Sequence, residues 1–469
     1  MFQLINDIVL EYRKCFKREK TWRWFVIIIL GLIIRSNNRG ITSIISSLRL
    51  KPRLYHAMLH FFRSTGYTTE TIYEKWFETV IQRTNLIRIA NRIVLIGDHI
   101  KIPKEGLHMP DIKMLRQDSQ NSGKAEYIAG HNYGQVSAVI TDDKTSRSIP
   151  LKTELQMSPP KQPTAGEPEP GSLVVQMMDL VTNTARMINE PAVTALDAYF
   201  SSSAAWSAID NTKNENGEKQ LELVTRAQTN TVGYAAVTAP SCKKRGRPRK
   251  YGDRVVLYDL FADMSKFTES TMTLYGRKMT VKHLCVDLFW KPAQQLVRFI
   301  VVESANGRCV LMSSSLSLTD EEIIAIYALR FKIETSFDEQ KNDVGSFAYH
   351  FWTTAMPKFM SWKSIEPSTD RTHQRRVHDT KRATQTYVCL ATIAAGILTI
   401  IAFTNNRQIW SRYSGWLKTL RSNIPSIAIV KETLLQDFQG SFDFFIGLPL
   451  FDVIRPLRRS VDFLYRNVA

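Results

Sequence analysis

Apolar residues are spaced in two different ways along the chain. Over residues 1–90 they recur at helical intervals, which predicts a largely helical region. From residue 91 they form short continuous runs that predict β-strands over 92–98, 135–141, 148–155, 191–200 and 221–227. A helical period over 173–189 lies among these strands. Strands and helices in this order predict a mixed α/β domain.

Residues 229–316 interrupt that pattern. They include a polar basic run, SCKKRGRPRKYGDR, and then short β-like pieces, which together predict a β-rich insertion. A long helix is predicted over 318–343, because Thr319 is a suitable N-cap and three acidic residues follow it at the positive end of the helix dipole. A mixed, mostly helical region ends the chain. The predicted divisions are 1–90, 91–228, 229–316, 317–404 and 405–469.

Two apolar runs raise the question of a membrane. FVIIILGLII (25–34) is too short to cross a bilayer. YVCLATIAAGILTIIAF (387–403) is borderline in length, and its Thr, Ala and Gly content favours a buried core helix over a membrane span. Mixed polar sequence follows Met1, so no signal peptide is expected.

Residues 40–62 read as two short helices with a break near Leu50–Pro52. This pattern is typical of a helix-turn-helix, in which Arg49, Lys51 and Arg53 would lie at the break and could meet DNA phosphates. An ordinary helical bundle fits the pattern equally well.

Charge and cysteine content narrow the choice of partner and compartment. A chain of 469 residues is too long to fold around one hydrophobic core of ordinary size, so two to four domains are expected. The formal net charge is +18 and the isoelectric point is about 9.6, which favours a polyanionic partner, nucleic acid ahead of anionic membrane. The five cysteines are scattered and lack CxxC pairs, which argues against a disulfide framework or zinc ribbon and fits a reducing compartment.

A polar stripe lies within the predicted helix over 318–343. Tyr327, Arg330, Glu334 and Lys341 stand at offsets 0, 3, 7 and 14. A helix turns about 100° per residue, so these offsets place all four on one side. Cations bind phosphate oxygens, but a carboxylate among them repels phosphate unless a metal ion lies between. The combination is typical of a metal-dependent enzyme acting on nucleic acid.

Two more carboxylates end or interrupt apolar strand-like runs: Asp98 follows RIVLIG, and Asp197 lies in ALDAYF. Metal-assisted phosphodiester chemistry needs a cluster of such oxygen ligands. Taken singly, Asp98 could merely end a strand and Glu334 could pair with Arg330. Asp338 could be the ligand in place of Glu334. Taken together with the stripe, the carboxylates favour a metal site.

The chain resembles DDE transposases of bacterial insertion sequences, in the branch with the Tyr-Arg-Glu-Lys signature. The signature matches in spacing, and the family's first and second aspartates match in IGDH (96–99) and LDAYF (196–200). The resemblance spans roughly residues 40–404 of the sequence. It implies an RNase H-like core with a β-rich insertion before the glutamate, where the gap is longer (334 − 197 = 137 positions against 197 − 98 = 99). Phe331 replaces the family's usual Trp, which we interpret as a packing change.

The resemblance also implies roles for matching positions. Two Mg²⁺ ions, replaceable by Mn²⁺, would be bound by Asp98, Asp197 and Glu334. Activated water would cut a phosphodiester at the element's end, and the freed 3′-hydroxyl would attack target DNA. Phosphates of the cut end would be held by Tyr327, Arg330 and Lys341. The implied partners are element and target DNA and a second copy of the chain, without a membrane, in the bacterial cytoplasm and nucleoid.

Two further segments are candidates for contact with DNA. The run KKRGRPRK (243–250) resembles an AT-hook and would place cations in a narrow minor groove, namely Arg245, Arg247, Arg249 and Lys250. A solvated basic loop is the alternative. Some relatives stack a flipped base on a Trp of the insertion, and Trp290 is the candidate here, although an aromatic residue of the sheet core is the commoner role.

Three functions therefore remain open, with a membrane protein, which would rest on residues 387–403, as a fourth. The resemblance favours a transposase. A DNA-binding repressor that has lost catalysis would not need the three carboxylates, and a site-selective nuclease would cut without joining.

Overall fold

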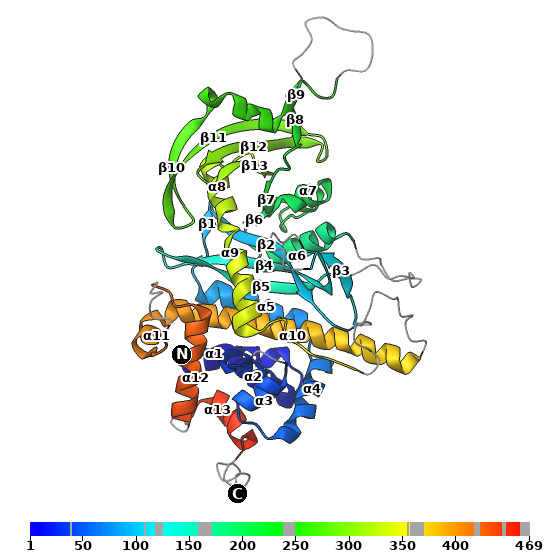
Figure 1. Ribbon diagram of the computed structural model, residues 1–469, viewed down its shortest axis with the longest axis vertical. Helices are drawn as coiled ribbons and strands as arrows, with labels where there is room; N and C mark the ends of the chain where they lie inside the picture. Colours follow the sequence, from blue (N-terminus) through cyan, green and yellow to red (C-terminus); the bar gives the residue numbers. More distant parts are fainter. Residues whose placement is uncertain are drawn as a thin grey trace, which may run out of the picture.

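The chain is represented by a computed structural model that describes residues 1–37, 40–106, 109–117, 125–157, 171–237, 249–353, 356, 370–416, 423–442 and 447–459. One large mixed sheet runs through it, with helices packed on both faces (Figure 1). The strands are β1 (Arg88–Ile89), β2 (Arg92–Pro103), β3 (Lys113–Arg116), β4 (Tyr127–Thr141), β5 (Ser146–Leu155), β6 (Ala192–Leu196), β7 (Leu221–Arg226), β8 (Val232–Tyr234), β9 (Arg254–Val256), β10 (Thr268–Leu274), β11 (Arg277–Trp290), β12 (Gln295–Ser304) and β13 (Gly307–Ser313).

The centre of the sheet has the order β5–β4–β2–β6–β7. The pairs β2–β4 and β4–β5 are antiparallel, whereas β6 and β7 run parallel to β2. Because this region is covered on both sides, β2 is apolar without alternation, as predicted. Val94 and Ile96 pack on the face that α8 and α9 cover, and Ile93 and Leu95 pack on the opposite face. A mixed α/β fold is confirmed.

The helices are α1 (Phe2–Glu11), α2 (Glu19–Ile34), α3 (Thr42–Ser47), α4 (Tyr55–Arg63), α5 (Thr69–Arg83), α6 (Leu173–Ile188), α7 (Ser203–Asp210), α8 (Asp320–Leu329), α9 (Lys332–Asp338), α10 (Arg371–Thr404), α11 (Asn406–Arg412), α12 (Ile427–Ser441) and α13 (Pro449–Ile454). A π-helical segment, Glu339–Val344, follows α9 directly.

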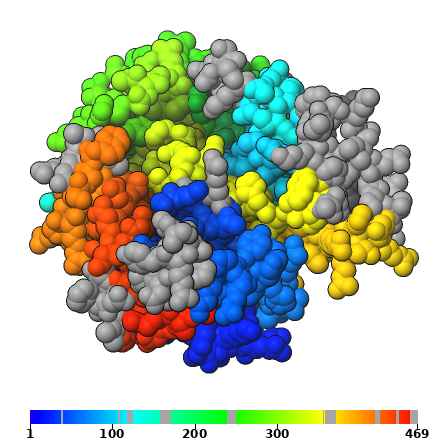
Figure 2. All heavy atoms as spheres, turned by 60° about the horizontal axis from the view of Figure 1, so that its bottom comes forward, coloured from blue at the N-terminus to red at the C-terminus, as the bar shows by residue number. Residues whose placement is uncertain are grey.

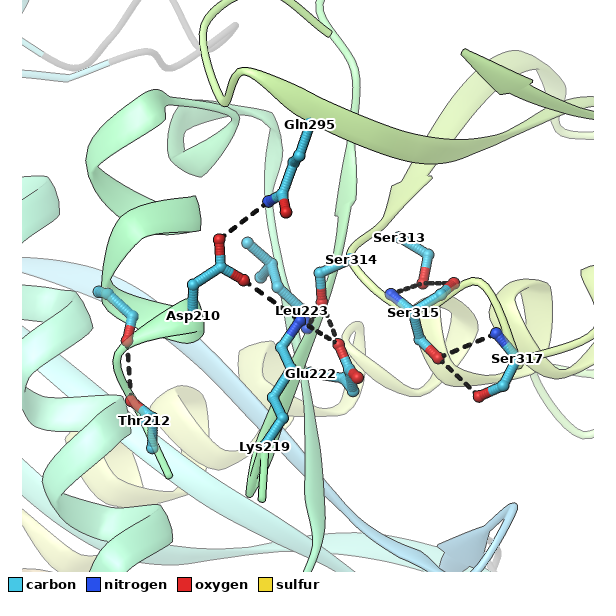
Figure 3. Close-up of polar contacts among 11 residues, drawn as sticks. Asp210, Thr212, Lys219, Glu222, Leu223, Gln295, Ser313, Ser314, Ser315 and Ser317 are labelled. Atoms are coloured by element: carbon cyan, nitrogen blue, oxygen red, sulfur yellow. Dashed lines mark hydrogen bonds and ion pairs between the residues drawn. The ribbon is translucent and has the colours of Figure 1, made fainter. Parts of the chain in front are cut away.

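The strands of residues 229–316 extend the same sheet. β13 pairs antiparallel with β7, and β12, β11, β8 and β9 follow in that order. A polar network lies at this junction (Figure 3). Ser314 donates to the Glu222 carboxylate, and Lys219 lies 2.9 Å from the same carboxylate. Gln295 of β12 donates to Asp210 of α7 at 3.1 Å. The first bond joins the segment after β13 to the core strand β7, and the last joins β12 to α7.

Helix α10 lies between the sheet and the terminal helices (Figure 1). Within the part of the chain that the structure describes, it is the one helix long and apolar enough to cross a membrane, and 94% of its apolar window is buried in the fold. The core helix predicted over 387–403 is therefore confirmed.

The N- and C-terminal regions form one helical layer. α12 and α13 pack on α2, and Asn6 of α1 accepts a hydrogen bond from the Leu450 amide at 3.0 Å. Figure 2 shows the two regions, blue and red, side by side on one face. The sequence pattern had predicted them as separate divisions.

The predicted break near Leu50–Pro52 separates α3 from α4. It is covered by the C-terminal segment, because Lys51 donates to the Pro456 carbonyl at 3.2 Å and Leu50 pairs with Arg458. Lys51 therefore contacts its own chain, while Arg53 stays exposed.

Candidate active site

Asp98 lies on β2, and Asp197 lies just after the end of its parallel neighbour β6. β2 and β6 are in register at Ile96 and Ala195, and each aspartate lies two residues further on. Neighbouring strands are about 4.8 Å apart, so this register brings the two carboxylates close together. Asp98 lies within β2, which is longer than predicted. Asp197 follows the end of β6, where its Oδ1 accepts a hydrogen bond from the Tyr199 amide at 3.0 Å.

Glu334 faces the sheet region of these aspartates from α9, which packs on β2 and β5. The single helix predicted over 318–343 is wrong in one respect, because a turn at Arg330 and Phe331 divides it into α8 and α9 before the π-helical segment. The predicted cap is confirmed: Thr319 forms a capping box with Glu322.

Arg330 connects the three carboxylates. Its guanidinium lies 2.9 Å from Asp98 Oδ2 and 3.8 Å from Glu334 Oε1, and it also interacts electrostatically with Asp197. Asp338 is exposed and accepts a hydrogen bond from Asn342 at 2.6 Å. The structure thus groups Glu334, and not Asp338, with the two aspartates.

The environment of the two aspartates disfavours their ionised forms. Burial and the neighbouring Asp197 charge raise the pKa of Asp98 to about 6, although Arg330 and the His99 amide oppose that rise. Burial also raises the pKa of Asp197. Two carboxylates that are difficult to ionise together have the donor chemistry of a Mg²⁺ site.

The fit to a metal is incomplete with Arg330 in this position. Among the described residues, no group of three or more His, Cys, Asp or Glu is arranged to hold a metal ion. Asp98 uses both carboxylate oxygens, one toward Arg330 and one toward the His99 amide. The two aspartates supply the oxygen donors that a divalent ion prefers, but both oxygens of Asp98 are engaged in the described state.

Comparison with known protein families shows which family the chain belongs to. The family described as DDE superfamily endonuclease matches residues 11–283. The chain belongs to this family. Asp98 and Asp197 fall inside the matched residues, whereas Glu334 falls beyond them. DDE endonucleases act on DNA and generally use divalent metals, so the matched family agrees with the carboxylate pair of this member.

Other comparisons add little. No curated protein matches the chain. A solved structure, the NurA nuclease from Sulfolobus solfataricus, is 12% identical and covers 60% of this chain and 86% of its own, with a TM-score of 0.19. A score that low carries no argument about the fold of this DDE endonuclease.

The remaining signature residues lie on α8 and on the π-helical segment. Tyr327 is half-buried, and the Arg330 guanidinium lies 5.9 Å from its ring centroid. Lys341 lies in the π-helical segment and is exposed. Phe331 is 54% exposed and meets the Tyr275 ring edge-on at 6.2 Å. The interpretation of Phe331 as a packing change stays a prediction; its ring packs on Tyr275 at the surface and not in the core.

Trp290 occupies the core position that the sequence allowed as its alternative. It is 6% exposed and meets Trp206 edge-on, with ring centroids 5.0 Å apart. A base could stack on Trp290 only if this pair opened, so the described state does not favour that prediction.

Only part of the AT-hook-like segment is described. Arg245 and Arg247 lie outside the described residues. Arg249 and Lys250 are exposed, and Lys250 lies 3.5 Å from Gln294 Oε1 at the turn between β11 and β12. Both cations can therefore contact a polyanion.

Sequence reasoning missed a basic cleft between the start of α2 and the end of α4. Its volume is about 680 Å³, and its basic lining residues are Lys17, Arg18, Lys20, His60 and Arg63. Trp24 and Phe61 also line the cleft, and no carboxylate does. The cluster KREK (17–20) beside an apolar helix could have indicated a basic surface. The cleft itself could not be predicted, because Arg63, which also lines it, lies more than 40 positions away in the sequence.

Proposed function

We propose that this DDE endonuclease is a DNA transposase that cuts the ends of a mobile element and joins them to target DNA. The observation that carries the proposal is the proximity of Asp98 on β2 to Asp197 just beyond the parallel strand β6, below the helix that bears Glu334. The central sheet supports an RNase H-like core, since three antiparallel strands lead through α6 to two strands parallel to β2.

Asp98, Asp197 and Glu334 would hold two divalent ions. Such ions, about 3.5–4 Å apart, stabilise the attacking and leaving oxygens of an in-line displacement. Mg²⁺ is the expected ion because the ligands are all carboxylates, and Mn²⁺ would fit the same oxygen ligands.

Arg330 would change partners during the reaction. It neutralises Asp98 in the described state. A bound cation would take over that role, and the guanidinium would become available to a DNA phosphate, which it can grip with two parallel hydrogen bonds. Tyr327 and Lys341 would hold the phosphates next to the cut. Strand joining further requires two ends in one complex, and we infer a dimer when DNA is bound.

A cleavage and joining assay tests the function. The chain is incubated with labelled element-end DNA, target DNA and Mg²⁺, and the products are separated by size. A transposase yields cut ends and joined products. Cut ends without joined products would indicate a site-selective nuclease, which the family's description as endonuclease also favours. Binding without cutting would indicate a repressor.

Metal binding is expected to weaken below pH 6. A metal ligand must be deprotonated, and the pKa of Asp98 is raised to about 6. The carboxylate fraction therefore falls about tenfold per pH unit below that value. Direct titration with Mn²⁺ at several pH values measures the effect. Affinity that stays constant from pH 7 to pH 5 would contradict it.

The basic cleft and Lys341 are expected to contact phosphates. Arg63→Ala and Lys341→Ala should each weaken DNA binding at low salt and reduce the slope of log affinity against log salt by about one. Arg23→Ala is the matched control, because Arg23 already pairs with Glu19 at 2.5 Å. Binding measured over a salt series tests this, and unchanged slopes would exclude both contacts.

A further inference from the structure

A row of polar side chains crosses three neighbouring strands beneath α9. Asp98 of β2 pairs with Gln135 of β4, which in turn pairs with Thr153 of β5. Residues directly opposite each other on paired strands point to the same face of the sheet. The row therefore faces the helix that carries Glu334.

Gln135 is the centre of a hydrogen-bond network between the sheet and the helical segment above it. Its Nε2 donates to Ser137 at 3.0 Å and to Ser336 of α9 at 3.1 Å. Its Oε1 accepts from Thr153 at 3.0 Å and from Gln340 at 2.5 Å. The amide thus makes all four hydrogen bonds available to it, two within the sheet and two to the helical segment above.

The network is buried. Gln135 and Gln340 are both fully inaccessible, and Ser336 is nearly so. Gln340 also donates to Ser336 at 3.3 Å, from within the π-helical segment. A π-helical turn adds one residue to the turn and is often found at functional sites. Here the wider turn lies where Gln340 points into the sheet.

We propose that Gln135 and Gln340 are positioning residues, which fix the placement of Glu334 on α9 relative to Asp98 on β2. This inference rests on the proposed function. Apolar contacts between α9 and the sheet, such as those of Ile333 and Phe337, have no fixed direction and tolerate sliding. Hydrogen bonds are directional. Those of Gln135 therefore help to set the position of α9 and of the carboxylate it carries, together with the two bonds that join Lys332 of α9 to Ser146 and Ser148 of β5 at 2.7 and 2.8 Å.

Three variants test the inference: Gln135→Leu, the double variant Gln135→Leu with Gln340→Leu, and Gln220→Leu. Gln220 is the matched control, because it is also a buried glutamine of the sheet region but donates to Ala185 of α6 at 3.0 Å. Each is measured for direct Mn²⁺ affinity, hydrogen exchange of the α9 amides without metal, thermal midpoint and DNA affinity.

Gln135→Leu should lower Mn²⁺ affinity about tenfold and speed exchange in α9, with DNA affinity unchanged, in line with outer-sphere substitutions at metal sites. The double variant removes both amides, so its thermal midpoint should recover toward wild type while Mn²⁺ affinity stays low. Gln220→Leu should lower the thermal midpoint but leave Mn²⁺ affinity, α9 exchange and DNA affinity unchanged. Unchanged Mn²⁺ affinity and α9 exchange in Gln135→Leu, or equal losses in Gln220→Leu, would overturn the inference. A wild-type chain that binds no Mn²⁺ would instead overturn the proposed function.

Discussion

Asp98→Asn, Asp197→Asn and Glu334→Gln are each expected to lower DNA cleavage about 1,000-fold or more, while DNA binding persists. Each change replaces a charged ligand by a neutral amide of the same shape. Metal ions contribute several kcal/mol to charge stabilisation in the transition state, and each 1.4 kcal/mol corresponds to a factor of ten in rate. Cleavage rates in single-turnover assays measure the loss.

The Asp98 variant carries a second expectation that separates loss of chemistry from loss of folding. The folded chain raises the pKa of this carboxyl to about 6, so ionised Asp98 destabilises the fold above that pH. Asp98→Asn should therefore be at least as stable as wild type at pH 7.5, and its advantage should shrink toward pH 4. Asp210→Asn, at the end of α7, should keep full cleavage. Substantial residual cleavage in a carboxylate variant would remove that residue from the ligand set.

Trp76→Ala is expected to destabilise the chain by about 3–5 kcal/mol, the usual cost of removing a buried aromatic side chain. Trp76 of α5 is fully buried and packs so tightly on Gly396 of α10 that a Cβ there would lie 2.0 Å from its ring. Its indole also donates to the Pro150 carbonyl of β5 at 2.9 Å, which would lose its donor.

Denaturant unfolding of Trp76→Ala and of Trp416→Ala measures this effect. Trp416 is 83% exposed, so its substitution should leave the free energy of unfolding almost unchanged. Equal denaturant midpoints for the two variants would show that the packing of Trp76 between α5, α10 and β5 contributes little to stability. Loss of this packing should also loosen β5, which is separated by β4 from the strand β2 that carries Asp98.

Local pattern predicted the strands and helices well because most of them are buried on one or both faces. The periodicity over 173–189 became α6 close to its predicted bounds, and the apolar run before Asp98 became β2, which begins as predicted and continues five residues further. The terminal helices were harder, since their packing on each other depends on contacts between residues more than 400 positions apart, such as Asn6 with Leu450. No short-range pattern encodes such a contact.

The site was predictable in its residue types but not in its connections. Spacing identified the stripe of Tyr327, Arg330 and Glu334, yet it could not show that Arg330 binds Asp98. Gln135 escaped notice because a lone glutamine in a strand is ordinary. The polar residues that accompany it in HNYGQVS were the available signal, since a buried strand seldom carries so many.

The shared packing of both chain ends limits how this protein can be dissected. Helix α2 is apolar on nearly every side and is covered by α10, α12 and α13. A fragment ending near residue 90, or a product of premature termination before α12, would present that helix to water and should aggregate or be degraded. Helices α1 to α5 are thus not expected to form a stable folded unit in isolation from α10, α12 and α13.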